Sequence, residues 1–326
     1  MPARLLVLFV FLVPLTGAVY SNEAVSAKLA LSRMEESLSS LQPPEGYRVR
    51  IYWTGLDGPD GLALSNEGRL VVCEELAGRV LLLEPDGARV LVEDLDHPEG
   101  VCIDGKGNLY VVEDVGDGRL LRVSESGEVS VLADRLSAPE GVAVSSDGTV
   151  YVSQSTVQLS ALPLGYRTWV TAFRPEGLVD TLAYGRYVRS YSGLAIGPDG
   201  LLYVCNEASG VSTWDAVVSI DPRTGQTDGF CRGPVSCEGL CFQPGGDFPM
   251  LLVEEDVGGG SGRLSIVSGD GRFQPFASGF GTLEDVVVDG EGRIFVTQDS
   301  DGTVLVIYPD KVERGEFSGS GQSGGL

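Results

Sequence analysis

The sequence predicts an all-β fold, a six-bladed β-propeller with four-stranded blades, and two observations carry this prediction. One short module recurs six times, and each copy contains brief β-branched apolar runs bounded by Gly, Asp or Asn. The copies begin PDGLAL (59–64), PEGVCI (98–103), PEGVAV (139–144), YSGLAI (191–196), CEGLCF (237–242) and LEDVVV (283–288). Their starts lie 39 to 52 residues apart, which suits one four-stranded blade per copy. A β-sandwich with regular hairpins is the alternative, but it does not explain six similar copies.

Further strands follow the opening segment of each copy. A Gly-containing turn and a second apolar strand come next, as in SNEGRLVV and DGKGNLYVV, and then a third and a fourth strand. The last copy has a third strand, TVLVIYP (303–309), but no obvious fourth. The segment YRVRIYW (47–53) precedes the first copy, and we expect it to supply the missing strand. Such pairing closes the ring and removes its exposed edges.

Sequence composition divides the chain into four parts. Residues 1–21 contain a basic residue, a short apolar run and small residues, which is typical of a secretory signal peptide. A retained membrane anchor is the alternative for this segment. Residues 22–45 are expected to form a helix and linker, 46–310 the propeller, and 311–326 a flexible Gly/Ser-rich tail. We therefore expect a secreted, periplasmic or extracellular protein.

Acidic residues outnumber basic ones. The chain has 46 Asp and Glu against 23 Lys and Arg, for a formal net charge of −23. Such a field repels nucleic acid and anionic membranes, so neither is an expected partner beyond the signal segment. It favours metal ions and amine ligands, although a solvated acidic surface is the alternative explanation.

Many of these acids are expected to meet at one end of the central channel. The innermost strand of a propeller blade lines the channel, and its start lies on the same face as the end of the second strand. The residues before each first-strand Gly, or before Asp in the last copy, are Asp60, Glu99, Glu140, Ser192, Glu238 and Glu284. The ends of the second strands add Glu74, Glu75, Glu113, Asp114, Asn206, Glu207, Glu254, Glu255, Asp256 and Asp299.

Carboxylates crowded in this way must take up protons, pair with bases or bind a cation. Few basic residues accompany the motifs. A hard cation with oxygen ligands, Ca²⁺ before Mg²⁺, is therefore expected. Two alternatives remain: the acids cap backbone turns, or they hold a cationic organic ligand directly.

The P-E-G or P-D-G segment followed by a DG-x-LYV turn resembles the SMP-30/gluconolactonase/LRE-like propellers over residues 46–310. Paraoxonases, strictosidine synthase-like proteins and NHL-repeat proteins share this wider superfamily. The resemblance implies a divalent metal, usually Ca²⁺, on the channel axis, held from first-strand positions that include Asn in the third and fourth blades. Here the third position is Glu140 and the fourth is Ser192. The expected metal ligands are Asp60, Glu140, Glu238 and Asn206.

Together with these residues, the resemblance implies an exported, Ca²⁺- or other divalent-metal-dependent hydrolase of lactone or ester substrates. A bound metal polarises a carbonyl and lowers the pKa of a water, while a neighbouring carboxylate acts as general base. The candidate bases are Glu99, Glu140 and Glu284, with His97, the single histidine, as a further candidate. The alternative is a non-catalytic propeller that binds a small ligand or a protein at its acidic mouth. A strictosidine synthase-like condensation, in which a Glu holds an amine, is a third reading.

Aromatic residues and cysteines complete the expectations. Tyr187, Tyr191 and Trp214 are expected to form a ligand wall, with packing between blades as the alternative. The six cysteines of an exported chain suggest disulfides. Equivalent positions in neighbouring blades favour Cys73–Cys102 and Cys205–Cys241, leaving Cys231 and Cys237. Alternatively, Cys fills a slot for a small residue, because Ala63 occupies the position of Cys102 in its own copy.

Overall fold

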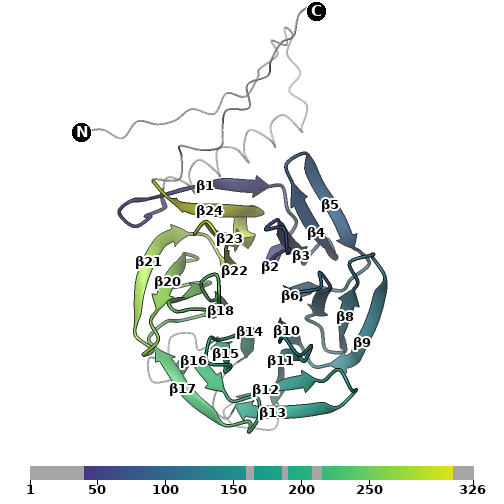
Figure 1. Cartoon of the computed structure of the whole chain (residues 1–326). Helices are drawn as coiled ribbons and strands as arrows, with labels where there is room; N and C mark the ends of the chain where they lie inside the picture. The colour runs from purple at the N-terminus through teal and green to yellow at the C-terminus, as the bar shows by residue number, and fades with distance from the viewer. Residues whose placement is uncertain (1–39, 159–164, 186–189, 208–214, 311–326) are drawn as a thin grey trace, which may run out of the picture.

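The computed structural model describes residues 40–158, 165–185, 190–207 and 215–310. In these residues the chain forms 24 β-strands in six antiparallel four-stranded sheets. The sheets stand around a common axis as the blades of a propeller (Figure 1). The predicted fold class is therefore confirmed. None of the described helices has the length and apolar character needed to span a membrane.

In the first five blades the strands follow chain order from the channel outward. Blade 1 contains β2 (Pro59–Leu64), β3 (Leu70–Glu74), β4 (Arg79–Glu84) and β5 (Gly87–Val92). Blade 2 contains β6 (Pro98–Ile103), β7 (Leu109–Glu113), β8 (Gly118–Val123) and β9 (Val129–Leu136). Blade 3 contains β10 (Pro139–Val144), β11 (Val150–Gln158), β12 (Gly165–Phe173) and β13 (Val179–Gly185). Blade 4 contains β14 (Tyr191–Ile196), β15 (Leu202–Asn206), β16 (Asp215–Ile220) and β17 (Thr227–Arg232). Blade 5 contains β18 (Cys237–Cys241), β19 (Met250–Glu254), β20 (Gly262–Val267) and β21 (Phe273–Phe280).

The sixth blade combines both ends of the propeller sequence. It contains β22 (Leu283–Val288), β23 (Ile294–Gln298) and β24 (Thr303–Pro309), and its outermost strand is β1 (Tyr47–Thr54). β1 pairs antiparallel with β24, with Tyr47 opposite Pro309 and Thr54 opposite Thr303. The first strand of the propeller thus completes its last blade, as the sequence analysis expects.

Apolar side chains fill the layers between neighbouring blades. Every residue of the second strands β3, β7, β15, β19 and β23 is buried. These strands are therefore almost continuously apolar, because both of their faces contact neighbouring blades. The packing holds the innermost strands in place around the channel.

Glycine at the third residue of five of the six inner strands lets neighbouring strands approach each other at the axis. A Cβ on Gly61 would lie 2.1 Å from the carbonyl oxygen of Glu99, and one on Gly100 would lie 2.2 Å from that of Glu140. Backbone therefore packs on backbone from one blade to the next. The residue that precedes each glycine, an acid in four blades and Ser192 in blade 4, is consequently placed at the channel.

None of the expected disulfides is present, because all six cysteines are free. Cys73 lies in the layer between blades 1 and 2 together with Val101, whereas the next residue, Cys102, packs in the layer between blades 2 and 3. Cys205 lies between blades 4 and 5, while Cys241 packs between blades 5 and 6. Adjacent strand residues point to opposite faces, so each expected pair is divided between two layers.

Cys231 and Cys237 do share one buried layer with Cys205, without a bond between them. Burial raises the pKa of Cys237 well above its ordinary value. These thiols behave as small apolar side chains, which is the alternative that the sequence left open.

Candidate functional site

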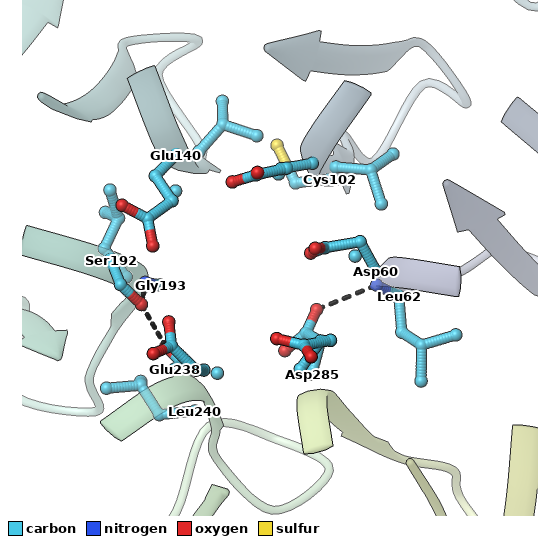
Figure 2. Close-up of a pocket in the computed structure, with 18 of the residues that line it drawn as sticks. Asp60, Leu62, Cys102, Glu140, Ser192, Gly193, Glu238, Leu240 and Asp285 are labelled. Carbon is cyan, nitrogen blue, oxygen red and sulfur yellow. Dashed lines mark hydrogen bonds between the residues drawn. The ribbon is translucent and has the colours of Figure 1, made fainter. Parts of the chain in front are cut away.

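The inner strands bring all six predicted first-strand positions to one cavity at the channel mouth. The cavity has a volume of about 860 Å³, and its lining includes Asp60, Glu99, Glu140, Ser192, Glu238 and Glu284. Figure 2 shows Glu140 and Glu238 on one side of the open space and Asp60 on the other. The convergence of these side chains follows from the repeated first strand, since each blade contributes the same position.

A second set of side chains surrounds the first. It comes from the residue directly after each second strand, and its members are Glu75, Asp114, Ser155, Glu207, Glu255 and Asp299. In blade 3 the strand continues through this position, where Ser155 stands in place of an acid. The cavity is therefore enclosed by carboxylates on most sides and by hydroxyl groups near blade 3.

The last residue of the second strand has a different role in blades 1, 2 and 5, where it does not line the cavity. Glu74, Glu113 and Glu254 are fully buried. Glu254 accepts hydrogen bonds of 2.6 and 2.7 Å from Arg263 and one of 2.8 Å from the backbone N–H of Val235. Glu74 and Glu113 pair with Arg79 and Arg119 in the same way. Each of these three carboxylates also accepts a backbone N–H from the loop before the inner strand of its own blade, and so holds that loop in place.

Asn206 takes this structural position in blade 4, which corrects its expected role as a metal ligand. The side chain is completely buried and is absent from the cavity lining. Its Nδ2 donates a 2.8 Å hydrogen bond to the carbonyl of Asp215, and its Oδ1 has no hydrogen-bond partner. The next residue, Glu207, lines the cavity instead.

Burial and mutual repulsion change the proton affinity of the mouth carboxyls. Desolvation, followed by the charges of neighbouring acids, raises the pKa of Asp60, Glu99 and Glu238 well above the usual range. The same causes raise the pKa of Glu284 to about 8. Burial raises the pKa of Asp285, also in the lining, to about 7. Without a cation, several of these groups hold protons at neutral pH.

Two groups of three carboxylates have the spacing of a cation site. We call Asp60, Glu75 and Glu99 the Asp60 trio, and Glu140, Glu207 and Glu238 the Glu140 trio. Within each trio, one oxygen from each residue lies within 4.8 Å of the others. The expected ligands Asp60, Glu140 and Glu238 are therefore divided between two trios. An all-oxygen donor set fits Ca²⁺, which takes six to eight oxygens in flexible geometry.

One buried carboxylate next to the Asp60 trio has another acid as its neighbour. Asp114 Oδ1 accepts no hydrogen bond from a nitrogen donor of the described residues, and the Asp114 side chain is paired with the carboxyl of Glu99. A buried acceptor of this kind costs free energy unless a donor or a cation reaches it. The observation fits a positive group in the mouth.

His97 lies at the rim and outside the cavity lining. Its Nε2 is 4.0 Å from Glu75 Oε1, and its Nδ1 is 2.9 Å from Asp96 Oδ1. Half of the side chain is exposed, and the hydrogen bond with Asp96 raises the pKa of the imidazole. His97 therefore lies close enough to Glu75 to interact with its charge. It does not reach into the cavity, where a catalytic base would have to lie.

Hydroxyl groups near the Glu140 trio include two that the sequence analysis missed. Ser190 Oγ lies 3.3 Å from Glu140 Oε2 and 2.8 Å from Ser155 Oγ. Ser192 Oγ instead donates a 2.7 Å hydrogen bond to the carbonyl of Glu238 and accepts the N–H of Gly193. The hydroxyl of Ser192 is therefore hydrogen-bonded to the backbone on both sides. Ser155 lies within β11, at the position that the acids Asp114 and Glu207 take in the neighbouring blades, and this equivalence in the repeat could have identified it.

The expected aromatic wall is corrected at its one described member. Tyr191 is fully buried in the layer between blades 3 and 4 and does not line the cavity. This burial raises the pKa of its phenol to about 12. Tyr187 and Trp214 lie outside the described residues.

Comparisons with known proteins support this fold. No protein-family model matches the sequence, and no curated protein matches it. Among solved structures, a gluconolactonase of Xanthomonas campestris is similar, with 18% identity, a TM-score of 0.66, and 82% of this chain and 91% of that chain covered. A PQQ-bound aldose sugar dehydrogenase of Streptomyces coelicolor shows 18% identity and a TM-score of 0.61, with 82% and 99% covered. A virginiamycin B lyase of Staphylococcus aureus shows 12% identity and a TM-score of 0.55, with 82% and 99% covered.

These similarities show a propeller fold shared with gluconolactonases, and they support the resemblance to that superfamily at the level of the fold. The three proteins catalyse different kinds of reaction. Because one fold hosts many activities, the function of this chain must be argued from its own cavity.

Proposed function

We propose that the chain is an exported, divalent-metal-dependent hydrolase of lactone or ester substrates, with Ca²⁺ as its metal. The observation that carries the proposal is the pair of carboxylate trios facing one cavity of about 860 Å³. A cavity of this size accommodates a small organic substrate beside an ion. The similarity to a gluconolactonase supports the reaction class.

The Glu140 trio is the proposed metal site. It retains two of the four expected ligands and adds Glu207, while the hydroxyl of Ser190 lies beside Glu140. When bound there, a divalent metal supplies Lewis-acid polarisation of a carbonyl and a lowered pKa for water. The all-oxygen donors of this trio agree with a hard cation.

Glu284 is the proposed general base. It lines the cavity but belongs to neither trio, so its carboxylate remains available for proton transfer. Its pKa of about 8 lies near neutral pH, which is the range in which a base removes a proton from water efficiently. Glu99 and Glu140, the other candidates, are each committed to a trio.

The test is hydrolysis of a panel of lactones and aryl esters by the purified protein. We expect turnover with Ca²⁺, loss of turnover with EDTA, and recovery when Ca²⁺ is added back. Glu284→Gln should lower kcat at least 100-fold, while the exposed Glu128→Gln serves as the matched control. Absence of chelator-sensitive hydrolysis on the whole panel would exclude this function. Amino-terminal sequencing of the mature protein tests export.

A non-catalytic binding propeller is the second candidate. One specific observation favours it: the fourth-blade position carries Ser192, whose hydroxyl is engaged with the backbone of Glu238 and Gly193. That position does not offer the ligand that the resemblance implies. Under this alternative, the mouth binds a small ligand or a protein partner while no member of the substrate panel is turned over.

A further inference from the structure

The cavity lining carries far more negative charge than one metal ion can balance. Eleven carboxyl groups line it: Asp60, Glu75, Glu99, Asp114, Glu140, Glu207, Glu238, Glu255, Glu284, Asp285 and Asp299. No Lys, Arg or His occurs among the described residues of this lining. A divalent ion supplies two positive charges, so protonation or a second cationic species must compensate the remaining acids.

The two trios are separate places for positive charge. They share no residue, since the Asp60 trio comes from blades 1 and 2 and the Glu140 trio from blades 3, 4 and 5. Figure 2 shows the open space between Asp60 and the pair formed by Glu140 and Glu238. A metal in the Glu140 trio therefore leaves the Asp60 trio free to contact another group in the same cavity.

The Asp60 trio matches the hydrogen-bonding capacity of an ammonium group. An ammonium donates three hydrogen bonds, and the trio offers three carboxylates with oxygens within 4.8 Å of one another. Asp114 adds another buried carboxylate oxygen, and its side chain is paired with the acid Glu99 and not with a basic side chain of the described residues. His97 contacts Glu75 from the rim. No basic side chain of the described residues forms an ion pair with Asp60 or Glu99. Substrates with a carboxylate or phosphate group meet repulsion from most sides of this cavity.

We propose that the substrate is a cationic lactone or ester, whose ammonium group binds the Asp60 trio while its acyl group lies toward the Glu140 trio. The inference rests on the proposed hydrolase function and adds the charge class of the substrate. The Asp60 trio acts as a specificity determinant, and it does not take part in bond cleavage. The reaction remains hydrolysis: water adds to the acyl carbon, the acyl C–O bond breaks, and the alcohol oxygen takes up a proton.

The test compares α-amino-γ-butyrolactone, which carries an ammonium group, with its N-acetylated derivative at saturating Ca²⁺. We expect kcat/KM to be at least tenfold higher for the charged compound. Glu99→Gln and Asp114→Asn should each reduce this preference several-fold, mainly through KM, whereas the exposed Glu128→Gln should retain it. Equal kcat/KM values for the two compounds, or an unchanged preference in both mouth variants, would overturn the inference.

A binding measurement separates this inference from the proposed function. Calorimetry of the Ca²⁺-loaded protein should detect binding of n-butylammonium and at least tenfold weaker binding of N-butylacetamide. If no lactone or ester is hydrolysed, the hydrolase proposal fails, and the calorimetry still decides the charge preference. If hydrolysis occurs while the two probes bind equally, the hydrolase proposal stands and the cationic substrate is excluded.

Discussion

Asp285 Oδ2 accepts a 2.8 Å hydrogen bond from the backbone N–H of Leu62, which joins the innermost strands of the sixth and first blades. The other five inner strands have glycine at the position of Asp285. The second carboxylate oxygen accepts the N–H of Val286 at 2.7 Å. At the place where the ring closes, a side chain thus connects two strands.

Replacing Asp285 by alanine should destabilise the propeller by about 1–3 kcal/mol, because the backbone N–H of Leu62 then loses its acceptor in a buried place. Asp285→Asn should cost less, since its amide oxygen can still accept one hydrogen bond. Urea unfolding monitored by tryptophan fluorescence measures the difference. Equal stability of wild type and Asp285→Ala would show that this contact does not stabilise the ring.

Gly100→Ala should destabilise the fold by about 3 kcal/mol or more, because the added Cβ would lie 2.2 Å from the carbonyl oxygen of Glu140. Gly105→Ala is the matched control, as nothing lies within 4 Å of its Cβ position. Thermal unfolding of both variants checks this. A Tm for Gly100→Ala close to that of Gly105→Ala would contradict the close backbone packing at the axis.

Arg263→Met should cost about 3–5 kcal/mol, because it leaves the fully buried Glu254 carboxylate without its charge partner. Arg48→Met removes the exposed partner of Asp310 and should cost less than about 1 kcal/mol. Chemical denaturation of the two variants gives the comparison. Similar losses would argue against the structural role assigned to the ends of the second strands.

The metal-free protein should lose stability as pH rises. The pKa of Glu284 is about 8 in the folded chain, against an ordinary value of 4.5, so the folded state holds more protons than the unfolded state between these values. Stability is then greatest near pH 4.5 and falls as pH rises through 8. In EDTA we expect Tm to drop by at least about 3 °C from pH 5 to pH 8. Ca²⁺ should restore more stability at pH 8 than at pH 5, because protons compete with the metal for the carboxylates at the lower pH. A Tm that rises with pH in EDTA would contradict this.

The repeat alone predicted the blades, the ring closure and the convergence of the first-strand acids, because one position recurs in every copy. Errors arose where a one-residue difference decides which way a side chain points. Asn206 was expected at the mouth, but the next residue, Glu207, lies there. Cys102 and Cys241 likewise pack toward the following blade rather than the preceding one. The sequence shows that alternate side chains of a strand point to opposite faces of the blade. The register in which the strands pair is needed to decide which side chains face which neighbouring blade.

Spatial relationships between blades were also beyond the sequence. The division of the expected ligands into the Asp60 and Glu140 trios depends on how far apart the blades hold them. The contact of Ser190 with Glu140 joins residues that lie 50 positions apart. Tyr191 belongs to the core because its strand packs against blade 3, which an isolated aromatic residue does not reveal.

Calorimetric titration of the EDTA-treated protein with Ca²⁺ shows whether the carboxylates of the channel mouth hold a divalent cation. The account predicts saturable binding that is weakened at least tenfold by Glu140→Gln and by Glu238→Gln, and that the exposed Glu128→Gln leaves unchanged. Absence of saturable binding, or the same affinity in all three variants, would contradict a divalent cation held by the carboxylates of the channel mouth.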